Sequence, residues 1–306
     1  MSFFELYDLL NNSKLKYTQL RLMDDLNEGL GNMLGQLANN PFYQFQMSQE
    51  KIIELHNTER GNRYVSCWSK EKDLIAMWLL YSKNCDYIRI KTNSSKLKDA
   101  TDKFVKVNFF TNHIKSPQAT LMTFSLAEVE EVQYINFINL EKMLKKYKND
   151  VDKLYKKYDY RNKDDLRKII YENSDLCPTV FKKSSFIKDT AYQHEHELRS
   201  TFKIALRNDL SYDDFLKLKE EDKKNGEFHY LYKILDEEVK SNPNVIHIPV
   251  DDSFVEEICF DPRMPDFQKD IYIQALDLKD DIGIVETDIF GSKTKNIDFS
   301  MDWITE

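Results

Sequence analysis

The segment HEHELR at residues 194–199 holds the densest group of side chains that could do chemistry. In a strand, Glu195, Glu197 and Arg199 would share one face, because side chains alternate along a strand. An arginine two residues from a carboxylate keeps that acid ionised and oriented, which suits an acid that must stabilise developing positive charge. The alternatives are a salt-bridge ladder on a solvated sheet face and a zinc site at the two histidines. No third histidine or cysteine lies nearby in sequence, so we predict no metal site.

A second group lies in the segment RYVSCWSKEKDLIAMWLLY at residues 63–81. Its first part predicts a strand and its second part an apolar helix, which Ser69 is placed to cap. The polar and aromatic side chains of interest here are Ser66, Trp68, Ser69, Trp78 and Tyr81. Without further evidence, a helix cap and aromatic core packing explain this segment as well as a binding site does.

The remaining sequence predicts the elements that must position these side chains. Apolar residues at helical spacing predict helices at residues 3–12, 48–61, 70–84 and 266–276. Alternating or β-rich segments predict strands at residues 14–20, 63–69, 86–93, 102–110, 120–137, 191–206, 244–250 and 254–260. This order predicts an α+β fold with a mixed or antiparallel sheet core and packed helices.

Two charged helical stretches, at about residues 137–175 and 210–241, interrupt this pattern. The candidate site segments lie on both sides of the first stretch. We therefore predict one α+β domain over residues 1–306 with two helical insertions. The lysine runs could form an arm that binds a polyanion, but the interspersed acids favour solvated helical hairpins.

Composition narrows the classes of ligand. The chain has 44 Lys and Arg against 52 Asp and Glu, a formal net charge of −8, which disfavours a dedicated nucleic-acid binder but leaves room for a local basic patch. Only 7 of the 306 residues are glycine, and their spacing matches no phosphate-binding loop. A nucleotide would have to be held by arginine, serine and aromatic side chains.

The sequence also carries expectations about location. Its four cysteines are scattered, the N-terminus lacks the features of a signal peptide, and no apolar run is long enough to span a membrane. We expect a reduced, cytoplasmic protein with no membrane partner and with cysteines that mostly fill the core.

Four segments, taken in order, resemble the bacterial domain-of-unknown-function 2971 family. They are the acidic turn at residues 24–28, the Cys67-Trp68-Ser69 … Met77-Trp78 … Tyr81 pattern, the Glu195–Arg199 segment and the Asp261-Pro262-Arg263-Met264 turn. Members of that family resemble proteins described in phage resistance and abortive infection. The resemblance implies a bacterial protein with a role in antiviral defence or stress.

The serine-containing strand followed much later by Glu-x-Glu is also similar to ADP-ribosyltransferases, whose NAD site has no glycine-rich loop. This resemblance implies that Glu197 stabilises an oxocarbenium-like transition state and that Glu195 positions or deprotonates the acceptor. It implies further roles for residues that would bind NAD or orient Glu197: Arg21 at the pyrophosphate, Ser66 or Ser69 at the ribose, and Trp68 or Tyr81 on the nicotinamide. We also expect Trp78 and Arg199 among the binding residues, because the ordered motifs of the first family single them out, although Arg199 is not part of the transferase pattern.

The main alternative is a non-catalytic binding or sensor component of a defence or toxin–antitoxin system. In that case Glu195, Glu197 and Arg199 form a polar network that stabilises the fold, and the charged insertions contact a partner. The partner would be a protein or a small molecule. A metal-dependent nuclease that uses Asp24, Asp25 and the two glutamates is a third class, which the acidic balance disfavours.

Overall fold

The computed structural model describes residues 1–23, 25, 49–109, 121–123, 126–157, 184–206, 217, 220, 242–278, 281–287 and 289–290. The chain divides into two compact units, each built from separate parts of the chain. The first unit comprises Met1–Lys14, Glu71–Lys96 and Val250–Glu306, and the second comprises Leu15–Lys70 and Leu97–Pro249. Both contain helices and strands, which confirms the α+β class. That residues 1–306 form one domain stays a prediction.

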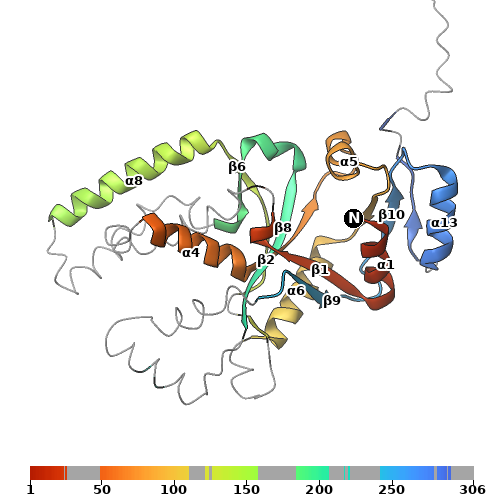
Figure 1. The fold of residues 1–306 in the computed structure, drawn as a ribbon, viewed down its shortest axis with the longest axis horizontal. Helices are drawn as coiled ribbons and strands as arrows, with labels where there is room; N and C mark the ends of the chain where they lie inside the picture. The colour runs from red at the N-terminus through yellow and green to blue at the C-terminus, as the bar shows by residue number, and fades with distance from the viewer. Residues whose placement is uncertain are drawn as a thin grey trace, which may run out of the picture. The chain divides into compact units, whose positions relative to one another are not determined.

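The second unit is built on one sheet (Figure 1). Its strand order is β4 (Leu121–Thr123), β8 (Glu197–Leu206), β2 (Arg63–Ser69), β1 (Lys14–Gln19) and β9 (Val245–Pro249), and β5 (Glu128–Glu131) also pairs with β8. Strand β2 runs antiparallel to both β1 and β8. The two strands that carry the candidate site segments, β8 and β2, are therefore direct neighbours, and β1 lies next to β2.

One face of this sheet carries an aromatic core. The Phe202 ring lies 5.0 Å from the ring of Tyr17 and 5.2 Å from that of Phe104, and its side chain is fully buried. The Tyr17 hydroxyl donates to Ser200 Oγ at 2.8 Å and also hydrogen-bonds Thr101 Oγ1 at 2.8 Å. Burial raises the pKa of Tyr17 to about 12, so the hydroxyl keeps its proton and remains a donor.

Phe104 and Thr101 belong to α6 (Ser94–Val107), where the sequence predicted a strand at residues 102–110. The prediction was wrong because Leu97, Thr101 and Val105 recur every four residues, and this is the face that the helix buries. The β-branched and aromatic residues at 102–110 suggested a strand, but the helical spacing becomes visible only when residues 94–101 are included. The predicted strand at residues 120–137 is instead three short strands, β4, β5 and β6 (Gln133–Ile135).

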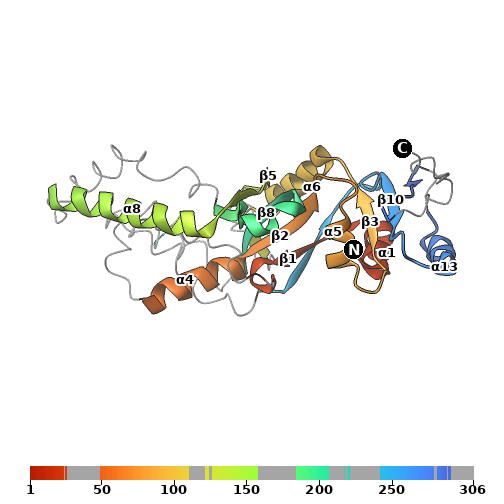
Figure 2. The ribbon, with the colours of Figure 1, turned by 90° about the horizontal axis from the view of Figure 1, so that it is seen from above.

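Helices and short strands complete the second unit (Figure 2). They are η1 (Leu20–Leu22), α4 (Gln49–Asn62), α8 (Phe137–Lys157) and β7 (Ile187–Asp189), which pairs in parallel with β6. Helix α8 occupies the first part of the predicted insertion at residues 137–175. Its remainder, and all but Lys217 and Glu220 of the predicted insertion at 210–241, lie outside the described residues. None of the described helices combines the length and apolar character needed to cross a membrane.

The first unit contains three helices and a small sheet within its described residues. The helices are α1 (Phe3–Asn12), α5 (Ile75–Tyr81) and α13 (Asp266–Leu276), and the sheet order is β11 (Gly283–Ile284), β10 (Glu257–Phe260) and β3 (Ile88–Lys91). Ser2 and Glu5 form a capping box at the start of α1, and the Phe3 ring stacks on Tyr272 of α13 at 4.2 Å. The predictions of helices at 3–12 and 266–276 are confirmed.

Candidate functional site

The segment before β8 is not the strand that the sequence predicted. Residues Thr190–Glu195 form the 3-10 helix η4, which begins where the Asp189 side chain accepts a hydrogen bond from the Ala191 N–H at 2.9 Å. The helix ends at His196, which has a left-handed conformation with φ of 46°. Only from Glu197 onward does the chain run as a strand. Glu195 therefore does not share a strand face with Glu197, and the prediction of a strand over 191–206 is wrong for its first part.

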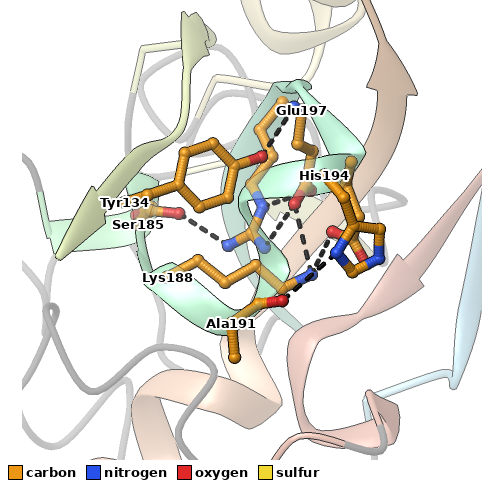
Figure 3. Close-up of polar contacts among 8 residues, drawn as sticks. Tyr134, Ser185, Lys188, Ala191, His194 and Glu197 are labelled. Carbon is orange, nitrogen blue, oxygen red and sulfur yellow. Dashed lines mark hydrogen bonds and ion pairs between the residues drawn. The ribbon is translucent and has the colours of Figure 1, made fainter. Parts of the chain in front are cut away.

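A buried ion pair between Glu197 and Arg199 lies at the start of β8 (Figure 3). Arg199 donates to Glu197 through two bonds, from Nε to Oε1 at 2.6 Å and from Nη2 to Oε2 at 3.1 Å. Its remaining terminal nitrogen, Nη1, donates to the Ser185 carbonyl oxygen at 2.9 Å. Arg199 is 1% exposed and Glu197 is 5% exposed. This two-bond geometry holds the carboxylate in one orientation.

Lys188, on β7, joins Glu195 to this pair. Its Nζ lies 2.6 Å from Glu195 Oε2 and 3.4 Å from Glu197 Oε2, and it also lies 4.5 Å from the centre of the Tyr192 ring. Two cations thus face two carboxylates, and all four side chains are buried. We call Lys188, Glu195, Glu197 and Arg199 the buried charge cluster.

Backbone contacts hold the cluster against the neighbouring strands. The Tyr134 hydroxyl, on β6, accepts a hydrogen bond from the Glu197 N–H at 2.8 Å, and the Val132 N–H donates to the Glu197 carbonyl oxygen at 2.9 Å. Burial, together with the negative charges of Glu197 and Glu195, raises the pKa of Tyr134. Its hydroxyl is therefore a neutral hydrogen-bonding group at physiological pH.

The electrostatics of the cluster keep Glu197 ionised. Burial by itself would raise the pKa of Glu197, because a buried carboxylate loses its hydration. The charge and hydrogen bonds of Arg199, the charge of Lys188 and a hydrogen bond with the Cys67 thiol outweigh burial and lower that pKa. Glu197 is a compensated carboxylate rather than a proton donor.

This lowered pKa predicts a specific acid sensitivity. The ionised form of Glu197 is favoured by folding, so its contribution to stability is complete above the ordinary pKa of 4.5 and is lost as the pH falls through the lowered value. We expect the urea midpoint to fall as the pH drops below about 4.5. In Glu197→Gln this part of the pH dependence should be absent. Urea titrations at a series of acidic pH values check it, and an unchanged acid slope in the variant would contradict it.

Ser69 lies directly beside the cluster. It is the last residue of β2 and pairs with Glu197 in the antiparallel register, while Cys67 pairs with Arg199. Paired residues on neighbouring strands project to the same face of a sheet. The predicted helix cap at Ser69 is wrong, because α5 begins only at Ile75, after Leu74.

Ser66 and Trp68 project to the opposite face, because side chains alternate along β2. Ser66 is buried, and its Oγ accepts a hydrogen bond from Trp68 Nε1 at 3.0 Å. The two side chains bind each other on the face that also carries the aromatic core. Neither shares the face of Glu197.

Arg21 lies at the other end of β2 from Ser69. Gln19, two residues before it, pairs with Tyr64, and the distance along β2 from Tyr64 to Ser69 is about 17 Å at the rise of a strand. The Arg21 guanidinium donates to Asn244 Oδ1 at 3.2 Å. The structure therefore does not bring Arg21 together with Ser69 and Glu197.

Trp78 and Tyr81 are on α5 in the first unit, where Trp78 is buried and Tyr81 is half exposed. The Asp261–Arg263 motif has a clear local role there. Arg263 Nη2 donates to the carbonyl oxygens of Trp78 at 3.1 Å and Ser82 at 3.0 Å, and its guanidinium also binds the fully buried Asp261 carboxylate. The motif thus gives the Ser82 carbonyl a donor and gives the Trp78 carbonyl a second one, beside the Ser82 N–H.

The described residues show what a ligand would meet at the two glutamates of the predicted NAD site. Both oxygens of Glu197 accept from Arg199, and one oxygen of each glutamate accepts from Lys188. Each glutamate is only 5% exposed, so a ribose hydroxyl could reach it only by displacing an existing partner. Arg21, which belongs to the same unit, is not part of this arrangement. NAD binding stays a prediction.

Sequence reasoning missed the residues that complete the cluster. Ser185 and Lys188 come from the segment just before residues 190–195, and Tyr134 comes from β6, far away in sequence. No local pattern marks them. Elsewhere along β2 and β8, Arg63 binds Glu128 at 3.2 Å and Lys203 binds Glu59, so charge pairing continues along the sheet. Within the described parts of the chain, no three His, Cys, Asp or Glu side chains come together as metal ligands.

Comparisons with protein-family models, with curated proteins and with solved structures found no match to this chain. The resemblances to the domain-of-unknown-function 2971 family and to ADP-ribosyltransferases therefore stay hypotheses that rest on the quoted motifs alone.

Proposed function

We propose that this protein is a non-catalytic binding component and that Glu195, Glu197 and Arg199 stabilise its fold rather than act on a substrate. The observation that carries the proposal is the buried charge cluster, in which two cations compensate two carboxylates. A catalytic acid needs an accessible oxygen near the reacting atom. Here both carboxylates are buried and already bonded. The setting in a defence or toxin–antitoxin system follows from the family resemblance alone.

A second candidate is an ADP-ribosyltransferase-like enzyme, which one observation favours. The sheet order places β8, β2 and β1 side by side, and Ser69 faces Glu197 across the β2–β8 pair. In this candidate the Glu197 carboxylate would have to break its hydrogen bonds to Lys188 or Arg199 when substrate binds. Breaking them would leave a buried cation without its counter-charge, which is costly.

The two candidates predict opposite results in one experiment. The purified protein is incubated with NAD labelled on the adenylate part and with cell lysate, and both label transfer to protein and nicotinamide release are measured. We expect neither to exceed the level seen with Glu197→Gln. An ADP-ribosyltransferase of known activity serves as the positive control. Nicotinamide release that Glu197→Gln abolishes, while the variant keeps its fold by circular dichroism, would overturn the proposal.

A further inference from the structure

Helix α8 carries a stripe of lysines on one side. Its exposed positions include Lys142, Lys145, Lys146, Asn149, Lys153, Lys156 and Lys157. At 3.6 residues per turn, these seven positions fall within an arc of about 120°, and at 1.5 Å per residue the stripe is about 22 Å long. We call this set the lysine stripe. It is a continuous basic surface on a protein whose formal net charge is −8.

The opposite side of α8 is buried at two described positions in the first half of the helix. Leu140 and Tyr147 are 2% and 6% exposed, and both lie about 140–160° around the helix from the centre of the stripe. Because Leu140 and Tyr147 are already covered, they are not available to a membrane as the apolar residues of an interfacial helix are. The lysine stripe is the side that remains for a partner.

The two acids of the helix whose side chains the structure describes lie at the borders of the stripe and not within it. Glu141 and Asp150 are about 80–100° from its centre, where Glu141 binds Lys145 at 2.6 Å and Asp150 binds Lys153 at 3.1 Å. These are surface pairs within one helix, and such pairs contribute only a few tenths of a kcal/mol. The interspersed acids of the sequence therefore do not neutralise the stripe. The paired lysines can give up their carboxylate partners to bind an anion of higher charge density.

The geometry of the stripe fits a chain of phosphates. A helix with its side chains is about 10–12 Å across, close to the width of about 12 Å of the DNA major groove. Lysine acts on phosphate as a point charge and reads no base edge. Figures 1 and 2 show α8 leading away from the sheet of its unit, and charges more than about 8 Å away are largely screened at physiological salt. Because of this screening, the net charge summed over the whole chain does not by itself set the electrostatic potential at the stripe.

We propose that the lysine stripe of α8 binds the phosphodiester backbone of a nucleic acid without sequence preference. This inference goes beyond the proposed function, since it names a ligand class and does not depend on whether the buried charge cluster is catalytic. It also revises the expectation, drawn from net charge, that nucleic acid is a poor partner. For binding at this surface, the local concentration of lysines matters more than the net charge of the whole chain.

The test measures binding of the full-length protein to a fluorescent DNA duplex of about 20 base pairs by anisotropy, over a series of salt concentrations. Six lysine–phosphate contacts predict a slope of log K against log salt of about −5. The affinity should then fall about 10³-fold between roughly 50 and 200 mM salt. In Lys146→Gln/Lys153→Gln/Lys157→Gln the slope should fall to about −3 and the loss of affinity to about 40-fold.

A matched variant separates the stripe from overall charge. Lys98, Lys103 and Lys106 of α6 are also exposed, and their replacement by glutamine changes the net charge by the same amount. We expect this control to keep the slope of the unmodified protein. An RNA duplex and a single strand of the same sequence show which nucleic acid is preferred, and binding to any of them through the stripe supports the proposal.

Three results would overturn it: no binding at about 50 mM salt, an equal loss of affinity in the α6 control, or displacement of the DNA by poly-glutamate as readily as by unlabelled DNA. Displacement by poly-glutamate would indicate that the stripe binds an acidic protein instead. Binding to anionic vesicles but not to DNA would assign it to a membrane surface and would likewise reject the proposal. The thermal unfolding midpoints of both triple variants confirm that they are folded. These outcomes do not bear on the NAD assay, so failure of one proposal is distinguishable from failure of the other.

Discussion

Replacing Glu197 by glutamine is expected to lower the free energy of unfolding by about 3–5 kcal/mol. The substitution keeps the size of the side chain but removes one of the two negative charges that compensate Lys188 and Arg199. Arg199 is 1% exposed and cannot regain its hydration without opening the structure. It is therefore left as an uncompensated charge in a buried position. Urea unfolding followed by circular dichroism measures the change.

An exposed pair on a strand of the same sheet provides the control. Glu131, at the end of β5, binds Lys70 at 2.6 Å, but these two side chains are 65% and 48% exposed. Glu131→Gln is the same chemical change in a solvated pair and should cost less than about 1 kcal/mol. If Glu197→Gln cost no more than Glu131→Gln, the cluster would not stabilise the fold, and the structural role that we propose for it would be rejected.

The stability measurement and the NAD assay together decide the role of Glu197. A structural carboxylate should lower stability when it is replaced, with no activity to lose. A catalytic carboxylate that must be open to substrate should be replaceable at small cost in stability and with loss of activity. The lowered pKa of Glu197 and its three charged or hydrogen-bonding neighbours agree with the first outcome.

Replacing Phe202 by alanine is expected to lower the free energy of unfolding by about 3–5 kcal/mol, for a different reason. Phe202 is fully buried, and its ring lies 5.0 Å from Tyr17, 5.2 Å from Phe104 and 6.1 Å from Tyr64. These rings come from β1, α6 and β2. Removing the Phe202 ring leaves a cavity at the point where the three elements meet, and rigid neighbours fill such a cavity only in part.

Two further variants place this result in context. Phe202→Leu keeps most of the volume and should cost about 1–2 kcal/mol. Leu126→Ala, at a position of the same unit that is 73% exposed, should change stability by less than about 0.5 kcal/mol. A loss below about 1 kcal/mol for Phe202→Ala would show that α6 does not pack on the sheet as described here.

Local patterns determined much of the secondary structure. The helices α1, α4 and α13 and the strands β1, β2, β9 and β10 lie where the sequence predicted them. In β1 and β9 the reason is plain, because buried and less buried residues alternate along each strand. The errors have local causes as well. In α6 the residues of a short window suggested a strand, and before β8 the cap at Asp189 and the turn at His196 shape the chain in a way that simple alternation cannot indicate.

The sequence by itself also singled out Glu195, Glu197 and Arg199 from their types and spacing. Only the tertiary structure decided what these side chains contact. Arg199 and Glu197 are two residues apart on one strand, so their pairing follows from local geometry. Lys188 reaches both glutamates from β7, because the 3-10 helix between them turns the chain back, and Tyr134 approaches from β6, 63 residues away in sequence. These contacts depend on the folded path of the chain and not on the spacing along one strand.

The same division applies to the lysines of α8. Their spacing and the arc that they occupy follow from the sequence once a helix is assumed. Which side of the helix is buried depends on what packs against Leu140 and Tyr147, and a sequence read one residue at a time does not contain that contact. Helical period is a property of neighbouring residues, whereas burial and charge compensation are properties of segments that meet only in the folded chain.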